Sequence, residues 1–196
     1  SPIHRLSHSG RRFADMARSP RTDADHEVQH VMNQGARRRD IFGDDADRIR
    51  FLAITERALS RYGSQLYAYV LMGNHYHLAL RCPERNVSEL MQYVGGQYAQ
   101  YFNRRNGYDG PLFRGRFHNV PVVSDGQLLA LVRYLHRNPI ELGVRQLADY
   151  RWSSHGAYIG QRPVPEWLET ELVLDLVGRN TAQLISMIEG PEAAAA

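Results

Sequence analysis

The stretch YAYVLMGNHYHLAL, residues 67–80, decides the fold, because it reads as two strands joined by a tight turn. Apolar and aromatic residues fill both halves, and Gly73-Asn74 between them favours a hairpin turn. In an extended strand, residues two positions apart face the same side of a sheet. His75 and His77 should therefore present two imidazoles side by side, while Tyr76 faces the other way.

The segment before this hairpin predicts a strand and then a helix. EVQHVMNQG (27–35) reads as a first strand, with His30 on one of its faces. Asp44 and Asp45 are good helix-start residues, and the apolar spacing after them predicts a helix that ends near Tyr62.

The segment after the hairpin adds a helix, a strand and a further helix. Asn86 and Glu89 resemble a capping box that opens the second helix, and a fourth strand is expected over 117–123. The third helix should begin after Ser124 and stop at Asn138, because Pro139 disfavours helical geometry in the residue before it. The first six elements match an α+β fold, a ferredoxin-like antiparallel sheet with helices on one face, followed by an extra helix.

Charge divides the chain into three parts. Residues 1–60 carry 11 Arg against 9 acids, residues 61–162 carry 12 Arg against 6 acids, and residues 163–196 carry 1 Arg against 6 acids. We expect a flexible segment over 1–26, a functional domain over 27–160 and an acidic, partly helical tail over 161–196. That tail could pack against the body, with Leu168, Leu172 and Leu176 on one helix face, or cover a basic surface.

Composition limits the class of protein. A chain of 196 residues can bury one core of ordinary size, and no apolar run is long enough to span a membrane. The single cysteine, Cys82, fits a reducing cytoplasm. All 24 basic residues are Arg, which reflects either a GC-rich genome or the recognition of phosphate by guanidinium groups.

The histidine pair becomes chemically informative beside residues of the third helix. A bare His-x-His is often only a hydrogen-bonded pair on a solvated face. Tyr134 and Asn138 are four apart and can share one helix face. Two imidazoles and an amide oxygen would suit Mg²⁺ or Mn²⁺. Tyr134 could then attack a phosphorus atom, with the metal and nearby Arg charge stabilising its phenolate.

Other residues compete for these roles. Tyr93 and Gln97 form another pair of a phenol and an amide at helical spacing, and spacing alone cannot reject them. The apolar periodicity around Tyr98 favours a place in the core, and Trp152 is expected to pack against the body. His136 should point to a different helix face from Tyr134, as a structural or a DNA-facing residue.

Arginines flank two turn-rich loops that could contact nucleic acid. One group follows the first strand and the other precedes the fourth; together they are Arg37, Arg38, Arg39, Arg104, Arg105, Arg114 and Arg116. They are either solvated loop charges or phosphate contacts along single-stranded or hairpin DNA. Interleaved aromatic residues such as Tyr108 could stack on unpaired bases.

The sequence resembles the HUH-motif single-tyrosine transposases of the IS200-like group, and most closely the REP-associated tyrosine transposases. The resemblance rests on five segments in order, which span about 130 residues: HVMNQGARRRDIF (30–42), AYVLMGNHYHLAL (68–80), YFNRRNGYDGPLFRGRF (101–117), RYLHRNPIELG (133–143) and DYRWSSHGAYIG (149–160). It implies that His75 and His77 bind the divalent metal, that Tyr134 is the nucleophile, and that Asn138 completes the metal site.

The same resemblance implies a function. The protein would cleave single-stranded DNA at a hairpin from a repetitive extragenic palindrome, through a 5′-phosphotyrosine intermediate, and rejoin strands without ATP. It would act in the bacterial cytoplasm near the nucleoid, as a monomer or a homodimer. Two alternatives stay open: a non-catalytic nucleic-acid binding module, and a replication initiator or relaxase with the same site chemistry.

Overall fold

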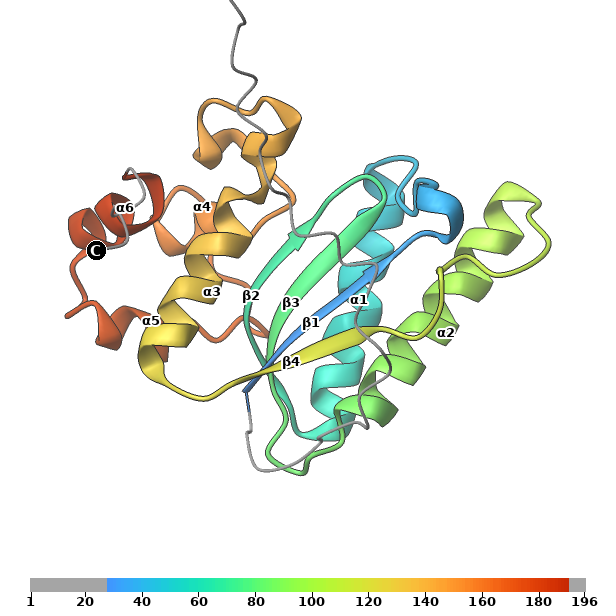
Figure 1. The fold of residues 1–196 in the computed structure, drawn as a ribbon, viewed down its shortest axis with the longest axis horizontal. Coiled ribbons are helices and arrows are strands. Elements are labelled where there is room, and N and C mark those ends of the chain that lie inside the picture. Colours follow the sequence, from blue (N-terminus) through green and yellow to red (C-terminus); the bar gives the residue numbers. More distant parts are fainter. Residues whose placement is uncertain (1–27, 191–196) are drawn as a thin grey trace, which may run out of the picture.

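A four-stranded antiparallel sheet forms the centre of the protein in a computed structural model that describes residues 28–190 (Figure 1). The expected flexible segment, 1–26, lies outside the described residues. The strands are β1 (Val28–Gln34), β2 (Gln65–Leu71), β3 (His75–Arg81) and β4 (His118–Val122). Their order across the sheet is β2-β3-β1-β4, which confirms the ferredoxin-like arrangement.

The hairpin expected from the opening stretch joins β2 to β3. Met72 donates its backbone N–H to the carbonyl of His75 at 2.8 Å, so the turn closes over Gly73-Asn74 as predicted. β1 pairs with the other side of β3, and this register places Met32 opposite His77 and His30 opposite Ala79. The hairpin therefore brings the histidine pair to the middle of the sheet, beside the first strand.

Two long helices cover one face of the sheet, α1 (Asp45–Tyr62) and α2 (Val87–Asn106). Asp44 caps α1, because its carboxylate accepts a hydrogen bond from the N–H of Asp47 at 3.1 Å. At the other end, Gly63 adopts the left-handed conformation that ends a helix. The core between these helices and the sheet includes Tyr76 and Tyr98, both fully buried.

The start of α2 corrects one expectation. Asn86 occupies the cap position, but its side chain makes no capping hydrogen bond. Its amide instead donates to the carbonyl of Tyr62 at 3.0 Å, which ties the start of α2 to the end of α1. The capping box with Glu89 is therefore wrong, because a contact distant in sequence uses the side chain that the local pattern assigned to the cap.

The third long helix, α3 (Asp125–Arg137), packs on the opposite face of the sheet (Figure 1). Ser124 caps it, accepting from the N–H of Gln127 at 3.3 Å. α3 ends at Arg137 as expected, and the chain continues at once into the 3₁₀ turn η2 (Asn138–Leu142). Leu128, Val132 and Leu135 bury the inner side of α3 against β2 and β3.

The C-terminal segment packs against α3. After the short elements η3 (Leu147–Asp149) and α4 (His155–Tyr158), the chain forms α5 (Glu171–Leu176) and α6 (Thr181–Glu189). The expected single helix with three aligned leucines is wrong. Leu168 pairs as an isolated bridge with Leu66 before α5 begins, and Leu172 is exposed. Val173 provides the buried contact of α5 instead.

The described part of this acidic tail lies on the far side of α3 from the first strand and its following loop (Figure 1). Arg133 donates to the carbonyl of Met187 at 2.7 Å, and Arg137 donates to that of Ile188 at 2.9 Å. These guanidinium groups satisfy carbonyls at the C-terminal end of α6, where cations are favoured. The described tail therefore packs against the body, as one of the two expectations had it.

Two buried histidines lie where α3 meets α4. His136 is fully buried, and its Nε2 hydrogen-bonds to the hydroxyl of Ser154 at 2.8 Å, so its role is structural. The ring centroids of His136 and His155 are 5.1 Å apart. Nε2 of His155 contacts a carboxylate oxygen of Glu189 in α6 at 3.0 Å. Burial holds the pKa of His136 well below its ordinary value.

We expect this burial to make the protein less stable in mild acid. As the pH falls below about 6.5, His136 becomes protonated in the unfolded chain but stays neutral in the folded protein. The free energy of unfolding should therefore decrease with falling pH, by up to about 1.4 kcal/mol per pH unit from this group. Urea denaturation of His136→Gln between pH 7.5 and 5.5 should give a shallower slope than the wild type. Equal slopes would show that His136 does not contribute.

Candidate active site

His75 and His77 lie on the face of the sheet that α3 covers. Their ring centroids are 5.2 Å apart. Tyr76, between them, points to the opposite face and packs 4.7 Å from the ring of Phe51 in α1. The alternation read from the sequence is thus correct, and the two imidazoles stand side by side.

Tyr134 lies over this pair from α3. The centroid of its ring is 5.5 Å from that of His77, in an edge contact, and the residue is 44% exposed. Most other tyrosines on or beneath the sheet are buried, as Tyr76 and Tyr98 are. The side chain of Tyr134 is therefore held by the sheet but remains open to a substrate.

Asn138 links the helix to the histidines. It is buried, and its side-chain amide donates to the carbonyl of Tyr134 at 2.9 Å. Asn138 also lies close enough to both side chains to raise the pKa of the His75 imidazole and to lower the pKa of the Tyr134 phenol. Its backbone is helical, so Tyr134 and Asn138 share one face as predicted.

His30 also lies in the candidate site, although its sequence context did not indicate this. Its Nε2 lies 2.9 Å from Nδ1 of His77, and its ring centroid is 5.8 Å from that of Tyr134. Alternation along the first strand placed His30 on one face, but not next to the histidine pair. Only the register of β1 against β3 could have revealed the contact, and no local pattern encodes that register.

The histidines are neutral, which suits metal ligands. Burial lowers the pKa of His30 to about 4 and lowers the pKa of His75. Burial, together with repulsion from the other two rings, holds the pKa of His77 well below its ordinary value. A neutral imidazole has a lone pair for a metal ion.

The donor set can be tested against a divalent ion. Nδ1 of His75 contacts the side-chain oxygen of Asn74 at 2.6 Å, and Nδ1 of His77 contacts His30, so Nε2 of each ring is the nitrogen left for a ligand. Within residues 28–190, no group of three His, Cys, Asp or Glu side chains could hold a metal. The third ligand would therefore be the amide oxygen of Asn138, a donor that Mg²⁺ and Mn²⁺ accept.

The electrostatics around Tyr134 differ from expectation. Burial raises the pKa of its phenol, and the charge of Glu141 in η2 raises it further. The hydrogen bond from Asn138 is the effect that opposes them, and no arginine contributes. The phenol is therefore protonated at neutral pH.

The competing tyrosines lie on the wrong face. Tyr93 is on α2, beneath the sheet, where its ring packs 6.2 Å from that of Tyr62. Tyr98 is buried in the same layer and donates its hydroxyl to the carbonyl of Ile41 at 2.5 Å. Neither residue can reach the histidine pair, because the sheet lies between them.

A model of the family described as "Transposase IS200 like" matches residues 25–138, more than half of the chain. The protein belongs to the IS200-like transposases. The match includes the histidine pair and extends through Tyr134 to Asn138. No curated relative matches the sequence significantly.

One solved structure shares the fold of this transposase. A REP-associated tyrosine transposase bound to a REP hairpin superposes with a TM-score of 0.62 at 17% sequence identity, over 80% of this chain and 93% of that one. A candidate transposase from Deinococcus radiodurans R1 matches with a TM-score of 0.43 at 16% identity, over 62% of this chain and 97% of its own. At these identities the first likeness establishes the fold.

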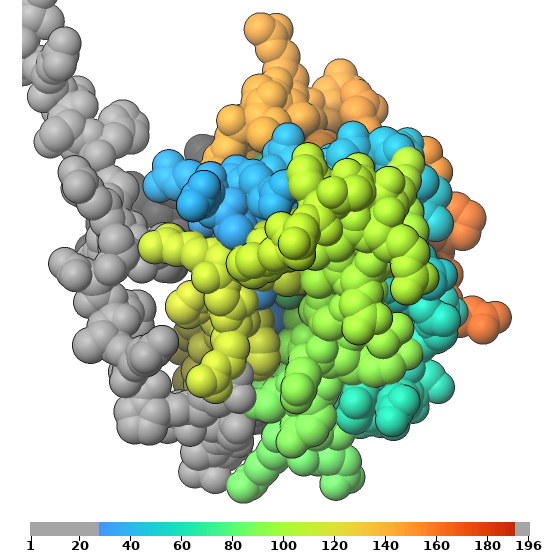
Figure 2. Space-filling view, turned by 90° about the vertical axis from the view of Figure 1, so that its right-hand side faces the viewer, coloured from blue at the N-terminus to red at the C-terminus, as the bar shows by residue number. Residues whose placement is uncertain are grey.

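One edge of the transposase is basic. After β1 the chain forms the turn η1 (Ala36–Arg38), which pairs with the loop before β4 through Gly35 and Phe113. Figure 2 shows these two segments side by side on one face of the molecule. They expose four of the predicted arginines: Arg37, Arg38, Arg114 and Arg116. η1 also adjoins the β2–β3 turn, so this basic edge lies next to His75.

Two of the arginines expected to contact DNA, Arg39 and Arg105, have partners within the protein. The guanidinium of Arg39 covers the ring of Tyr108 at 4.0 Å. Arg105 forms ion pairs with Asp44 and Asp47 at 2.5 Å each, which join the end of α2 to the start of α1. Arg104 is exposed nearby on α2. Arg105 is thus already paired within the protein, so we expect it to have a structural role rather than a contact with DNA.

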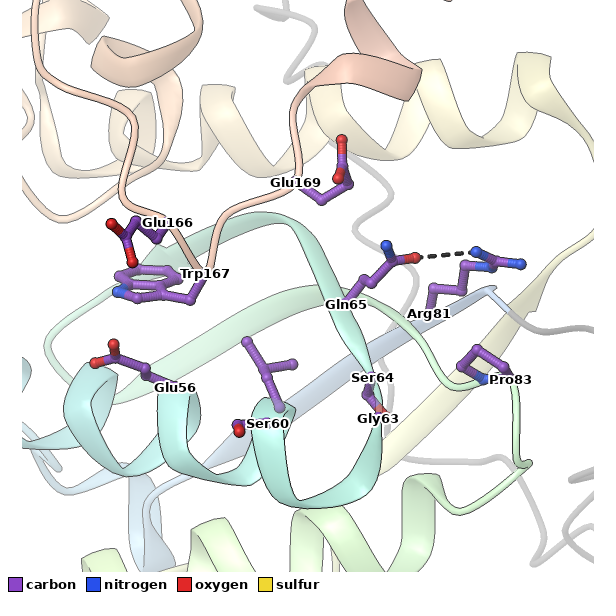
Figure 3. Close-up of a pocket in the computed structure, with 11 residues that line it drawn as sticks. Glu56, Ser60, Gly63, Ser64, Gln65, Arg81, Pro83, Glu166, Trp167 and Glu169 are labelled. Atoms are coloured by element: carbon purple, nitrogen blue, oxygen red, sulfur yellow. Dashed lines mark hydrogen bonds between the residues drawn. The ribbon is translucent and has the colours of Figure 1, made fainter.

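Two pockets of the transposase lie away from this site. A pocket of about 600 Å³ opens beside the end of α1, near Glu56, Gln65, Arg81 and Trp167 (Figure 3). Arg81 and His75 stand at opposite ends of β3. A smaller hollow of about 380 Å³ lies on the α2 side, near Gly95 and Arg116. At the candidate site, the exposed group is Tyr134, whereas His77 is buried beneath it.

Proposed function

We propose that the protein is a single-tyrosine DNA strand transferase that cuts single-stranded DNA and forms a 5′-phosphotyrosine at Tyr134. The observation that carries the proposal is the accessible phenol of Tyr134 held against His77, with Asn138 hydrogen-bonded to the backbone carbonyl of Tyr134 and lying close to His75. Membership of the IS200-like transposases supports DNA as the substrate.

The covalent step exchanges one phosphodiester bond for another, so it needs no energy-supplying cofactor. The oxygen of Tyr134 attacks the scissile phosphorus, and the bond from phosphorus to the 3′ oxygen breaks in line with the attack. The phenol loses its proton, and the departing 3′ oxygen gains one to become a hydroxyl. One phosphodiester thus replaces another, so a later 3′-hydroxyl can reverse the step and join two strands.

The residues of the site divide the remaining tasks. His75, His77 and Asn138 would hold Mg²⁺ or Mn²⁺, which supplies Lewis-acid polarisation of a phosphate oxygen when bound. Contact with His77 and His30 restricts the ring of Tyr134, and the hydrogen bond from Asn138 lowers the pKa of its phenol. The charge of Glu141 opposes phenolate formation, so the metal-free site should be inactive.

The substrate would be a hairpin of REP type. One solved relative of the same fold is described as bound to such a hairpin. In the present chain, Arg37, Arg38, Arg114 and Arg116 would contact the phosphates of the stem or of the flanking strand. This basic edge adjoins His75 through the β2–β3 turn, so DNA bound there can reach Tyr134.

A cleavage assay tests this function. Labelled oligonucleotides that fold into hairpins from the host's own repeats are incubated with the protein, with Mn²⁺ or with EDTA. We expect site-specific cleavage and a protein–DNA adduct only with the metal ion. Binding without cleavage in any divalent ion would support a non-catalytic binding module instead. A scrambled stem of equal length serves as the control for hairpin recognition.

The basic edge should determine how strongly binding depends on salt. Replacing Arg37 and Arg114 with Gln removes two positive charges that would neutralise phosphates. The slope of log affinity against log salt should therefore decrease in magnitude by roughly 1 for each arginine replaced. The measurement is fluorescence anisotropy of a labelled hairpin between roughly 50 and 300 mM salt, where counterion release dominates the affinity.

Arg105→Gln is the matched control for this series. Arg105 is paired with Asp44 and Asp47, so its replacement should lower the melting temperature and leave the salt slope unchanged. If Arg105→Gln reduced the slope as much as Arg37→Gln does, the assignment of DNA contacts to the edge formed by η1 and the loop before β4 would be wrong.

A further inference from the structure

Each histidine of the pair is held at its Nδ1 atom by a different partner. The side-chain oxygen of Asn74 contacts Nδ1 of His75 at 2.6 Å, and Nε2 of His30 contacts Nδ1 of His77 at 2.9 Å. The amide of Asn74 donates its N–H to the carbonyl of Arg38 at 3.3 Å, which fixes which end of the amide faces His75. An amide oxygen only accepts, so Nδ1 of His75 carries the proton.

The contact between His30 and His77 does not by itself fix which nitrogen of His77 carries the proton. Between two neutral imidazole nitrogens, one donates and the other accepts, and either ring can take either role. If His30 donates, the proton of His77 lies on Nε2, and that nitrogen has no lone pair for a ligand. If His77 donates, its Nε2 is free, as Nε2 of His75 is. The contact with His30 therefore decides whether the second histidine can bind a metal.

We propose that His30 is a positioning residue, whose Nε2 accepts a hydrogen bond from Nδ1–H of His77 and so keeps Nε2 of His77 available to the metal. The inference rests on the proposed function, because it assumes that His77 is a ligand. His30 acts through His77 and touches neither metal nor DNA. Such hydrogen bonds commonly fix the tautomer and orientation of a ligating histidine.

The fold holds His30 firmly in this role. The register of β1 against β3 sets His30 diagonally across from His77 on the same face. The ring centroids of His30 and His77 are 5.1 Å apart, and the ring of Tyr134 closes over both from α3. His30 therefore contacts a proposed ligand and the proposed nucleophile together, and neither local spacing nor charge would have placed it there.

Two variants separate the hydrogen bond from simple packing. His30→Gln keeps an acceptor oxygen close to the place of Nε2, whereas His30→Leu keeps bulk without an acceptor. Calorimetric titration with MnCl₂ alone should show Mn²⁺ binding weakened about 10- to 100-fold in His30→Leu, a range typical of such partners, and close to wild type in His30→Gln. His118→Leu, which removes an exposed histidine in line with Met32 and His77, is the matched control.

The tautomer can be read directly in the metal-free wild type. Nitrogen-15 NMR of the histidine side chains should find the proton of His77 on Nδ1, and should find it on Nε2 in His30→Leu. A proton on Nε2 in the wild type would overturn the proposal, as would unchanged Mn²⁺ affinity in His30→Leu or equal losses in both variants. These readouts need no DNA, so a wild type that binds Mn²⁺ but never cleaves would count against the proposed function alone.

Discussion

Tyr134→Phe is expected to eliminate the covalent adduct on a suicide oligonucleotide, a loss of more than about 10³-fold, because it removes the oxygen that we propose attacks phosphorus. The ring itself remains, so the edge contacts with His30 and His77 are kept. Because the residue is 44% exposed, the loss of its hydroxyl should have little effect on stability. The measurement is the yield of adduct on a denaturing gel, beside hairpin affinity, which should stay unchanged.

Tyr93→Phe is the control for this experiment. Tyr93 has the same helical spacing to an amide, but it lies beneath the sheet against Tyr62. The control should form adduct like the wild type. A normal adduct yield from Tyr134→Phe would mean that another nucleophile attacks, and the assignment would fail even if the protein proved to be a nuclease.

His75→Leu and His77→Leu should each abolish metal-dependent cleavage, with a loss of roughly 10²-fold or more, because one of the two proposed imidazole ligands disappears. Calorimetry should show no Mn²⁺ binding near neutral pH in either variant. Hairpin affinity should persist, since the basic edge is intact. Tyr134→Phe should show the opposite pattern, with Mn²⁺ bound and no adduct formed.

This pair of results separates the roles of metal and nucleophile. If His77→Leu bound Mn²⁺ like the wild type, the metal would lie elsewhere, and Asn138 would lose its proposed part as well. Addition of EDTA to the wild type should reproduce the cleavage defect of the histidine variants and leave their stability unaffected.

Much of the fold follows from local sequence. The apolar runs either side of Gly73-Asn74, the alternation over 27–35 and the caps at Asp44 and Ser124 define strands and helices through contacts within a few residues. The predictions that were wrong share a cause. Asn86 bonds to Tyr62 rather than to its own helix, and Leu168 pairs with Leu66 as a bridge. Such partners are distant in sequence, so no local pattern can indicate them.

The candidate site divides in the same way. Spacing of two in a strand placed His75 with His77, and spacing of four in a helix placed Tyr134 with Asn138. The place of His30 depends on the pairing of β1 with β3. The ion pair between Arg105 and Asp47 depends on the packing of α1 on α2. The sequence also could not show that burial, rather than neighbouring arginines, governs the phenol of Tyr134.

One short side chain has a consequence for how the protein would respond to DNA. Asn74 donates to the carbonyl of Arg38 at 3.3 Å and contacts Nδ1 of His75 at 2.6 Å. A shift of the arginine turn upon a phosphate would therefore pull on the ring of His75 through a single amide. Under the proposed function, DNA binding at this turn and the orientation of His75 would be linked through Asn74, with no domain movement needed to connect them.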